Sequence, residues 1–421
     1  MEEIAIIGAG MAGLTLALSL AKHSIPVRIY EARSSSAGPS LGGAMMLSPN
    51  SLSLFDKLGA YQALLPLSYP FKAVYYKDAV EHTTDAYPMG SEELYGYPAL
   101  RTYRRDLHST LLRLCGERGV PMEYDAKFSR VVSESYKDGE EAVTFLLADG
   151  RTRKASLLVA SDGIHSTVRS YITDLKPMFV KIMGVAFTAK TSSFRIPAEK
   201  NYKFPLTITA SAGNILMAPQ NQDGGEMLTG RQFPVHEELS REGWEELGAD
   251  KKKLIAMMRS RIDEFPDIAR SALEYIDEST VYIWPYYKLP LLPSWGSEKG
   301  KVVLMGDAAH AIPPTTGQGA GMAVEDGVTL GEIIAASLGP QATVKWADGF
   351  RWWQETRKKR LNQLIELTTQ LNSRRLPPEK QAELPKEQIW VDESETNPRQ
   401  MAWLYEPHVE EEVERWISSY H

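Results

Sequence analysis

The chain has 421 residues, too many for one ordinary compact core and enough for two interleaved domains. Hydrophobic residues make up 43% and charged residues 24%, the mix of a soluble globular protein. The formal net charge of −7 argues against nucleic acid as a partner, because phosphate binding needs a concentrated positive surface.

Cys115 is the only cysteine, which excludes an intrachain disulfide and favours a reducing, cytoplasmic compartment. Its helical spacing from Leu107, Leu111 and Leu114 predicts a place in the core. No apolar run reaches about 18 residues, so no membrane span is predicted. The eight histidines lack the close pairing of metal ligands, so no metal site is expected.

The N-terminal elements form a βαβ pattern. Residues 3–8 read as a short buried strand, 11–23 as a helix and 27–31 as a second strand. Such a unit implies a parallel sheet, because parallel neighbours need a crossover connection.

The composition and the predicted secondary structure change twice in the middle of the chain. Residues 71–100 are rich in tyrosine and short β-like runs, which suggests an excursion out of the first sheet. After a helix at 105–118, strands are predicted at 143–147 and 155–160, joined through Asp149-Gly150. Residues 178–285 are mostly strands, interrupted by one helical stretch near 251–264, and predict a second, sheet-based domain.

The C-terminal part is predicted to be helical. A short buried strand at 302–305 leads through a glycine-rich turn into a helix, and residues 346–371 form a long amphipathic helix. The basic run 357–360 within this helix is interpreted as a solvated face. A closing amphipathic helix is expected at 409–417.

The first motif, Gly8-Ala9-Gly10-Met11-Ala12-Gly13, lies between the first strand and the first helix. Gly8 permits a tight turn, Gly10 lets the backbone approach a pyrophosphate, and Gly13 lets helix and strand pack closely. Glu31 ends the second strand, where an acidic residue can hold a ribose hydroxyl. The motif predicts a dinucleotide site without choosing between FAD and NAD, and a plain strand-to-helix turn is the alternative.

A second motif follows the strand at 302–305. Its parts are Gly306-Asp307-Ala308-Ala309-His310, Pro313-Pro314, Gly317-Gln318-Gly319-Ala320-Gly321 and Glu325-Asp326. An acidic side chain at a strand end can accept a bond from a ribityl or ribose hydroxyl, and the glycines allow backbone contact with a flat ring. The next helix would aim its N-terminal N–H groups at that ring and stabilise the anion of a reduced flavin.

This second motif resembles, at nearly every position, the second flavin motif of the group A flavoprotein monooxygenases, the family of p-hydroxybenzoate and salicylate hydroxylases. Ser161-Asp162-Gly163, after a strand, resembles the family's central Asp-Gly motif. Tyr103-Arg104-Arg105-Asp106-Leu107 resembles the helix start whose arginine reaches the FAD, with Arg104 at the matching position. The resemblance covers roughly residues 1–370.

Several of these residues also have simpler interpretations. Asp162-Gly163 could form only a turn, and Arg169 could be a surface charge. Glu325 and Asp326 could simply favour the first turns of a helix. His310 is interpreted as an ordering or packing residue rather than a general base.

The resemblance implies an α/β fold: a Rossmann-type FAD-binding domain with the GxGxxG, DG and GD motifs, an interleaved β-sheet substrate domain, and C-terminal helices. The FAD-binding domain is expected at residues 1–72, 101–177 and 286–345, the substrate domain at 73–100 and 178–285, and the helical segment at 346–421. The expected FAD contacts are Gly8, Gly10, Met11, Ala12, Gly13, Glu31, Arg33, Arg104, Asp162, Gly163, Gly306, Asp307, Pro314, Gly317, Gln318, Gly319, Ala320 and Gly321.

The resemblance also implies a reaction. NADH or NADPH reduces the FAD, and the absence of a second GxGxxG fits a transient visit by the nicotinamide. Reduced flavin and O2 then form a C4a-hydroperoxide, which hydroxylates or epoxidises a small aromatic or polycyclic metabolite. Pro313, Pro314 and Gly317 are expected beside the reactive ring, and no side chain is assigned a catalytic proton transfer.

The substrate site is expected between the middle strands and the loop 42–46. Met45, Met217, Gln232 and Tyr286 are candidates, although such residues are also ordinary core residues. Two other functions stay open. One is an FAD-dependent oxidase or demethylating enzyme on the same fold. The other is a flavin-binding interaction module with little turnover, whose Trp352 and Trp353 bind a partner.

Overall fold

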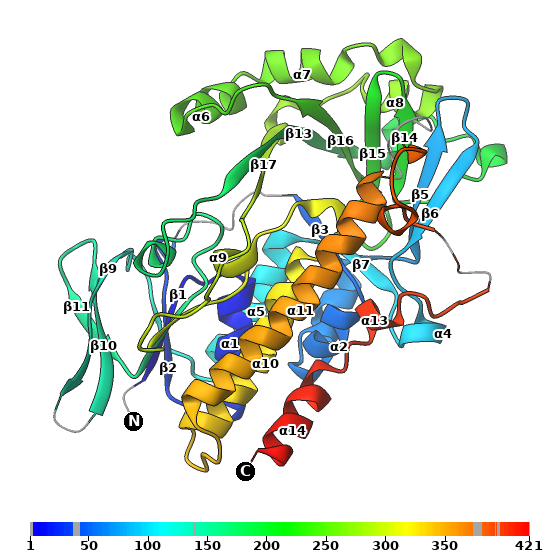
Figure 1. The fold of residues 1–421 in the computed structure, drawn as a ribbon. Coiled ribbons are helices and arrows are strands. Elements are labelled where there is room, and N and C mark those ends of the chain that lie inside the picture. Colours follow the sequence, from blue (N-terminus) through cyan, green and yellow to red (C-terminus); the bar gives the residue numbers. More distant parts are fainter. Residues whose placement is uncertain are drawn as a thin grey trace.

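The structure, a computed structural model, describes residues 3–36, 43–137, 140–373, 381–391, 393 and 396–420. The fold is α/β, with a parallel five-stranded sheet, a mixed seven-stranded sheet, two three-stranded sheets and long C-terminal helices (Figure 1). The predicted fold class is confirmed.

The five-stranded sheet has the order β18-β12-β1-β2-β8, and every neighbouring pair is parallel. All residues of β1 and β12 are buried, as expected for central strands covered on both faces. The crossover helix α1 follows β1, which confirms the predicted βαβ unit. The bounds are β1 Ile4–Ile7, α1 Met11–Lys22, β2 Val27–Tyr30, β8 Met122–Glu123, β12 Leu157–Ala160 and β18 Val302–Leu304.

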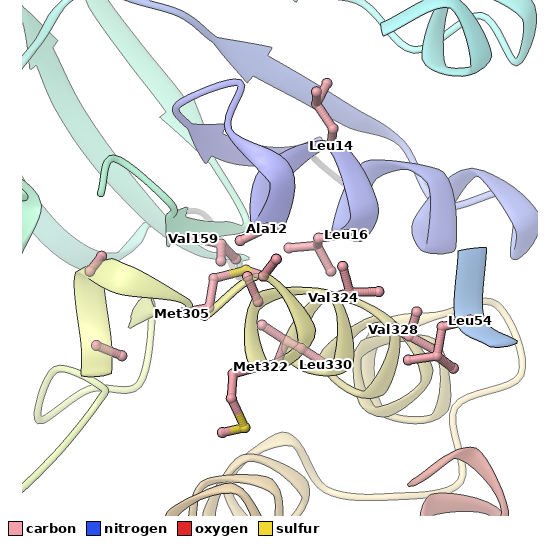
Figure 2. Close-up of a cluster of buried hydrophobic side chains, with 14 of the residues drawn as sticks. Ala12, Leu14, Leu16, Leu54, Val159, Met305, Met322, Val324, Val328 and Leu330 are labelled. Carbon is pink, nitrogen blue, oxygen red and sulfur yellow. The ribbon is translucent and has the colours of Figure 1, made fainter. Parts of the chain in front are cut away.

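Helices α1 and α10 (Gly319–Leu338) pack closely on this sheet. A Cβ on Gly327 of α10 would lie 2.9 Å from the backbone nitrogen of Leu16, so only glycine allows this approach. Figure 2 shows Leu16 pointing toward Val324 of α10, with Val328 against Leu54 of α2 (Pro49–Lys57). The contact holds the start of α10 next to the glycine-rich loop that precedes α1.

The seven-stranded sheet has the order β17-β13-β16-β15-β14-β5-β6, so strands from two separated stretches of the chain form one sheet. Its strands are β5 Ala73–Asp78, β6 Thr83–Pro88, β13 Met178–Lys190, β14 Leu206–Ala210, β15 Gly213–Pro219, β16 Glu226–Pro234 and β17 Tyr282–Lys288. Helices α6 (Arg241–Ala249), α7 (Lys251–Arg259) and α8 (Asp267–Ala272) cover the face away from the parallel sheet (Figure 1).

Two sequence predictions in this region were wrong in detail. Residues 251–264 were expected to form one helical stretch, but three helices occupy 241–272. Asp250, whose side chain caps α7 by accepting from the Lys253 backbone nitrogen, separates α7 from an additional helix, α6. The run 155–160 was expected to be one strand. It is split, because β11 (Thr152–Ala155) pairs with β10 (Glu140–Leu147) while Leu157 begins β12 in the parallel sheet.

Two small sheets complete the strands. Strand β9 (Phe128–Lys137) joins β10 and β11, and the second small sheet consists of β3 (Ala44–Leu47), β7 (Ala99–Tyr103) and β4 (Tyr69–Phe71). The remaining helices before the C-terminal segment are short, except α5: α3 Tyr61–Leu64, α4 Glu92–Tyr95, α5 Arg104–Glu117 and α9 Asp307–His310. On α5, Cys115 is buried, as predicted, and burial raises the pKa of its thiol to about 12.

The C-terminal segment packs against the rest of the chain. Helix α11 (Trp346–Ser373) runs beside α10, followed by α13 (Ala402–Tyr405) and α14 (Val409–Ser419) (Figure 1). Trp353 is fully buried, and Trp352 stacks on Trp416 of α14 with ring centroids 4.8 Å apart. None of the described helices is both long and apolar enough to cross a membrane.

Candidate functional site

The glycine-rich loop between β1 and α1 has the geometry that its motif requires. Gly8 has a φ of +101°, and a Cβ on Gly13 would lie 2.3 Å from the Gly8 carbonyl oxygen, so strand and helix meet at a distance only glycine permits. A Cβ on Gly10 would find only the Ser161 carbonyl oxygen, at 3.6 Å. Gly10 therefore faces open space at the N-terminus of α1, where a phosphate would meet backbone N–H groups.

Glu31 closes this loop from the end of β2. Its carboxylate accepts bonds from the backbone nitrogens of Ala9 and Arg33, both at 2.9 Å, and from Nε of Arg33 at 3.1 Å. Burial acts to raise the pKa of Glu31, but these donors outweigh it and hold the pKa below its ordinary value. The residue is thus an ionised acceptor beside the glycine loop, as a ribose-binding role requires.

Asp162 follows β12 on the same edge of the sheet. One carboxylate oxygen accepts bonds from the backbone of Thr167 and Val168, and the other is buried without a partner among the described residues. Burial raises its pKa. Arg169 is not a surface charge, an alternative that the structure corrects: it is 4% exposed and donates to the carbonyls of Ala308 and Ile164. It therefore ties the Asp-Gly motif to the Gly-Asp motif.

Asp307 begins α9, directly after the positive-φ turn at Gly306. Its side chain is exposed and makes no hydrogen bond with a described residue, yet desolvation raises its pKa because protein surrounds it on most sides. Arg104 feels the charge of Asp307, and its guanidinium lies 4.7 Å from the ring centre of Trp284 on β17. These three residues link α9, α5 and the seven-stranded sheet.

The loop 313–321 approaches β3, because a Cβ on Gly317 would lie 3.7 Å from the Cβ of Met46. Pro314 is exposed, Gly317 has a φ of +67°, and a Cβ on Gly319 would meet nothing within 4 Å. Gln318 is different: its side chain is buried, accepts a bond from Asn50 at 3.2 Å and donates to Ser48 at 2.8 Å. Its amide therefore anchors the loop to α2, and only its backbone remains for a cofactor.

A buried ion-pair network lies beneath the loop. Glu325 and Asp326 are fully buried on α10, and Arg357 of α11 donates to both at 2.7 Å. Arg360 adds a second pair with Glu325, and His310 lies 2.6 Å from Asp326. His310 is thus an ordering residue, as interpreted from the sequence.

Two expectations are corrected here. The basic run 357–360 is not simply a solvated face, because Arg357 is 1% exposed and Arg360 is 8% exposed. The charge pattern alone could not show that these arginines pair with Glu325 and Asp326 of α10. Glu325 and Asp326 do more than favour a helix start, since Asp326 also accepts a bond from the backbone nitrogen of Gly306 at 2.8 Å. The network therefore joins the Gly-Asp motif to α11.

The structure places the four substrate candidates in different surroundings. Gln232 and Tyr286 lie on the sheet face opposite α7 and α8, and their side chains are 3.2 Å apart. Met217 points to the face covered by α7 and α8 and is fully buried, so it cannot line a site on the opposite face. Met45 is 8% exposed and belongs to the main core.

An aromatic wall on β17 was not among the residues predicted from the sequence. Tyr282 and Trp284 lie on the same face as Tyr286, because alternate residues of a strand share a face. The register places Tyr282 opposite Ala186 and Trp284 opposite Gly184. The alternation of aromatic residues in 282–286 was a signal that could have found them.

The comparisons with known proteins agree with this geometry. A family model described as an FAD binding domain matches residues 1–367. The chain belongs to this family. Hispidin-3-hydroxylase of Neonothopanus nambi is 28% identical over 367 residues, 79% of this chain and 80% of that protein. Salicylate hydroxylase of Pseudomonas putida is 28% identical over 354 residues, 80% of this chain and 77% of that protein.

A solved structure shares the fold of this FAD-binding family member. Klebsiella pneumoniae HpxO complexed with FAD and uric acid has a TM-score of 0.72 and 20% identity, covering 99% of this chain and 95% of that chain. The chain is an FAD-dependent monooxygenase of the aromatic hydroxylase type. The residues fit FAD, since the site offers open glycines at 10 and 319, an unpaired Asp162 oxygen and an exposed Asp307.

Asp307→Ala is expected to weaken FAD binding while leaving the fold intact. The carboxylate makes no hydrogen bond with described residues, so its loss should remove only the bond expected with the cofactor, roughly 1–3 kcal/mol, or about 5- to 150-fold in affinity. Fluorescence titration of the apoprotein with FAD measures the change. Asp174→Ala, at an exposed aspartate, is the control. Wild-type affinity in Asp307→Ala would show that the cofactor does not use this carboxylate.

Proposed function

We propose that this enzyme inserts one atom of O2 into a small, flat aromatic substrate held between the FAD and the inner face of the seven-stranded sheet. NADH or NADPH supplies two electrons, so that substrate, O2, NAD(P)H and a proton give hydroxylated substrate, water and NAD(P)+. The FAD, when bound, supplies the electron transfer and oxygen activation. The cytoplasmic compartment remains part of this proposal.

The observation that carries the proposal is a row of small residues on the sheet face opposite α7 and α8, which we call the trough. The cross-strand row Tyr282, Ala186, Gly230 and Leu216 puts two small residues between two larger ones. Gly184 lies two residues before Ala186 on β13, on the same face, and is next to the Tyr286 hydroxyl. Small residues beside aromatic rings leave room for a planar ligand and offer apolar contact on its faces.

The chain's own residues orient the substrate and exclude water. The aromatic wall of β17 fixes the plane of the ligand, and Gln232 and Tyr286 provide polar groups at its rim. The loop 313–321, anchored through Gln318, would close the space on the cofactor side. Fixed placement and a dry site favour oxygen transfer to substrate over release of peroxide.

Purified enzyme with FAD should be screened against aromatic acids, phenols and polycyclic compounds. NAD(P)H oxidation and O2 uptake that both rise only with substrate, with hydroxylated product, support the proposal. O2 uptake without NAD(P)H consumption would identify an oxidase or demethylating enzyme instead. A protein with no ligand-stimulated uptake would be a binding module.

The interaction-module alternative receives no support from α11. Trp353 donates its indole N–H to Thr329 at 2.9 Å and is fully buried. Trp352 is half-buried, and its ring stacks on Trp416 of the same chain. Both tryptophans thus take part in the packing of the C-terminal helices.

Replacing both Pro313 and Pro314 with glycine is expected to uncouple the reaction. Two prolines restrict the backbone beside the reactive ring, and their loss would admit water and alternative loop conformations. FAD should stay bound, since the phosphate-binding loop lies elsewhere, while a larger share of electrons appears as H2O2. The ratio of product to NAD(P)H consumed, with H2O2 assayed in parallel, checks this. An unchanged ratio would mean that the loop does not guard the reaction.

A further inference from the structure

A buried pair of hydrogen-bond donors lies where β7 meets the seven-stranded sheet. Arg101 of β7 is 4% exposed, and its Nε donates to the side-chain oxygen of Gln220 at 3.0 Å. Gln220, directly after β15, is fully buried, and its amide nitrogen has no acceptor in the described part of the chain. This bond is also the single hydrogen bond of the Arg101 guanidinium with a described residue. The pair therefore holds several unused donors.

The charge of Arg101 has no carboxylate partner among the residues described. The charged or titratable groups that act on its pKa are the hydroxyls of Tyr282 and Tyr103 and the guanidinium of Arg104. Burial lowers the pKa of Arg101 to about 10, so the group is still cationic at neutral pH. A buried cation without a counter-ion is costly, and an anion supplied from outside would offset that cost.

The donor pair of Arg101 and Gln220 lies at the end of the trough nearest the loop 313–321. Arg101 pairs across the small sheet with Met46, whose Cβ would lie 3.7 Å from a Cβ on Gly317. Tyr282, which begins the cross-strand row of the trough, interacts electrostatically with Arg101. Gln220 follows Leu216 and Ala218 at a spacing of two along the strand that carries the row.

We infer that Arg101 and Gln220 form the subsite that binds a carboxylate group of the substrate, an inference that rests on the proposed function. A guanidinium and an amide N–H together offer donors to both oxygens of a carboxylate, which a single phenolate oxygen would not use as fully. The subsite would anchor one end of the ligand and lay its ring along the trough. Arg101 is thus a specificity-determining residue, selecting acids over their neutral analogues.

Other arginines around the sheet are already committed. Arg104 faces Asp307 and Trp284 on the cofactor side. Arg231 points to the opposite face, where it donates to the carbonyls of Met258, Ser260 and Ala212. Arg101 is therefore the arginine among these whose guanidinium remains available to a ligand.

The test compares benzoate with benzamide on the oxidised, FAD-loaded enzyme. The two probes have the same ring, and only benzoate carries the charge. Wild-type enzyme should bind benzoate at least about tenfold more tightly than benzamide, as charge-assisted bonds are the stronger ones. Perturbation of the flavin absorbance and calorimetry measure both dissociation constants without turnover.

Three variants then locate the effect. Arg101→Met should erase the preference for benzoate and leave benzamide affinity within about twofold, whereas Arg101→Lys should keep part of the preference. Arg105→Met removes an exposed charge nearby and should change neither affinity by more than about twofold. Each variant must retain FAD and its thermal transition.

Several outcomes would overturn the inference. The wild-type enzyme could bind the two probes equally, or could bind neither probe at about 10 mM. The preference for benzoate could survive Arg101→Met. Arg101→Met could also lose FAD, which would assign the arginine to the cofactor. The proposed function fails separately, through absence of substrate-stimulated NAD(P)H oxidation. A preference for benzoate in a protein without that activity would support the carboxylate subsite and contradict the proposed reaction.

Discussion

Arg357→Met is expected to lower the free energy of unfolding by about 3–5 kcal/mol, because removing one partner of a buried ion pair leaves the other charges uncompensated. Arg357 is 1% exposed and holds the carboxylates of both Glu325 and Asp326, which are fully buried. Methionine fills a similar volume without charge, so the loss reports on electrostatics more than on packing. Urea unfolding followed by circular dichroism measures it.

Lys359→Met on the same helix is the matched control. Lys359 is exposed, and its replacement should change stability by no more than about 0.5 kcal/mol. The network also holds Gly306 through Asp326, so Arg357→Met should release FAD more readily than the control does. Equal stabilities of the two variants would show that the network contributes little to the fold.

The same network predicts that the stability of the folded protein falls in acid. Burial acts to raise the pKa of Glu325, but the charges and hydrogen bonds of Arg360 and Arg357 lower it to about 2, below its ordinary 4.5. The folded protein therefore takes up this proton less readily than the unfolded chain. The stabilisation is complete above pH 4.5 and is lost as the pH falls toward 2. In Arg357→Met, acid unfolding should begin at a higher pH.

Gly10→Val is expected to abolish FAD binding, with a loss of affinity of at least about 100-fold. The backbone at Gly10 is extended, with a φ of −76°, so valine can adopt it, and the new Cβ would meet only Ser161 at 3.6 Å. The fold should therefore survive while the side chain occupies the space of the pyrophosphate. Flavin content after purification and titration of the apoprotein with FAD measure the effect.

Gly13 cannot serve for this test, because a Cβ there would lie 2.3 Å from a backbone oxygen and would disturb the fold itself. The control is Gly116→Val on α5, where a Cβ meets nothing within 4 Å. Its FAD affinity should equal that of the unmodified protein. Normal flavin content in Gly10→Val would place the pyrophosphate elsewhere.

The sequence by itself determined the fold class and the outline of the cofactor site. Local rules suffice there: glycines at fixed spacing between a strand and a helix dictate a close approach, and buried apolar runs dictate central parallel strands. The tight turn at Gly8, the contact at Gly13 and the position of Glu31 are all consequences of short-range chemistry. The assignment of these residues to FAD contacts remains a proposal, as do the domain boundaries.

Only the tertiary structure decided which face and which partner each side chain has. Alternation along a strand shows that Met217 and Leu216 point to opposite faces, but not which face α7 covers. Arg357 looks like part of an exposed basic run until α10 brings two carboxylates to it, 31 and 32 residues away in the chain. Arg101 meets Gln220 across 119 residues. Burial and charge pairing depend on neighbours that packing supplies, and no local pattern encodes them.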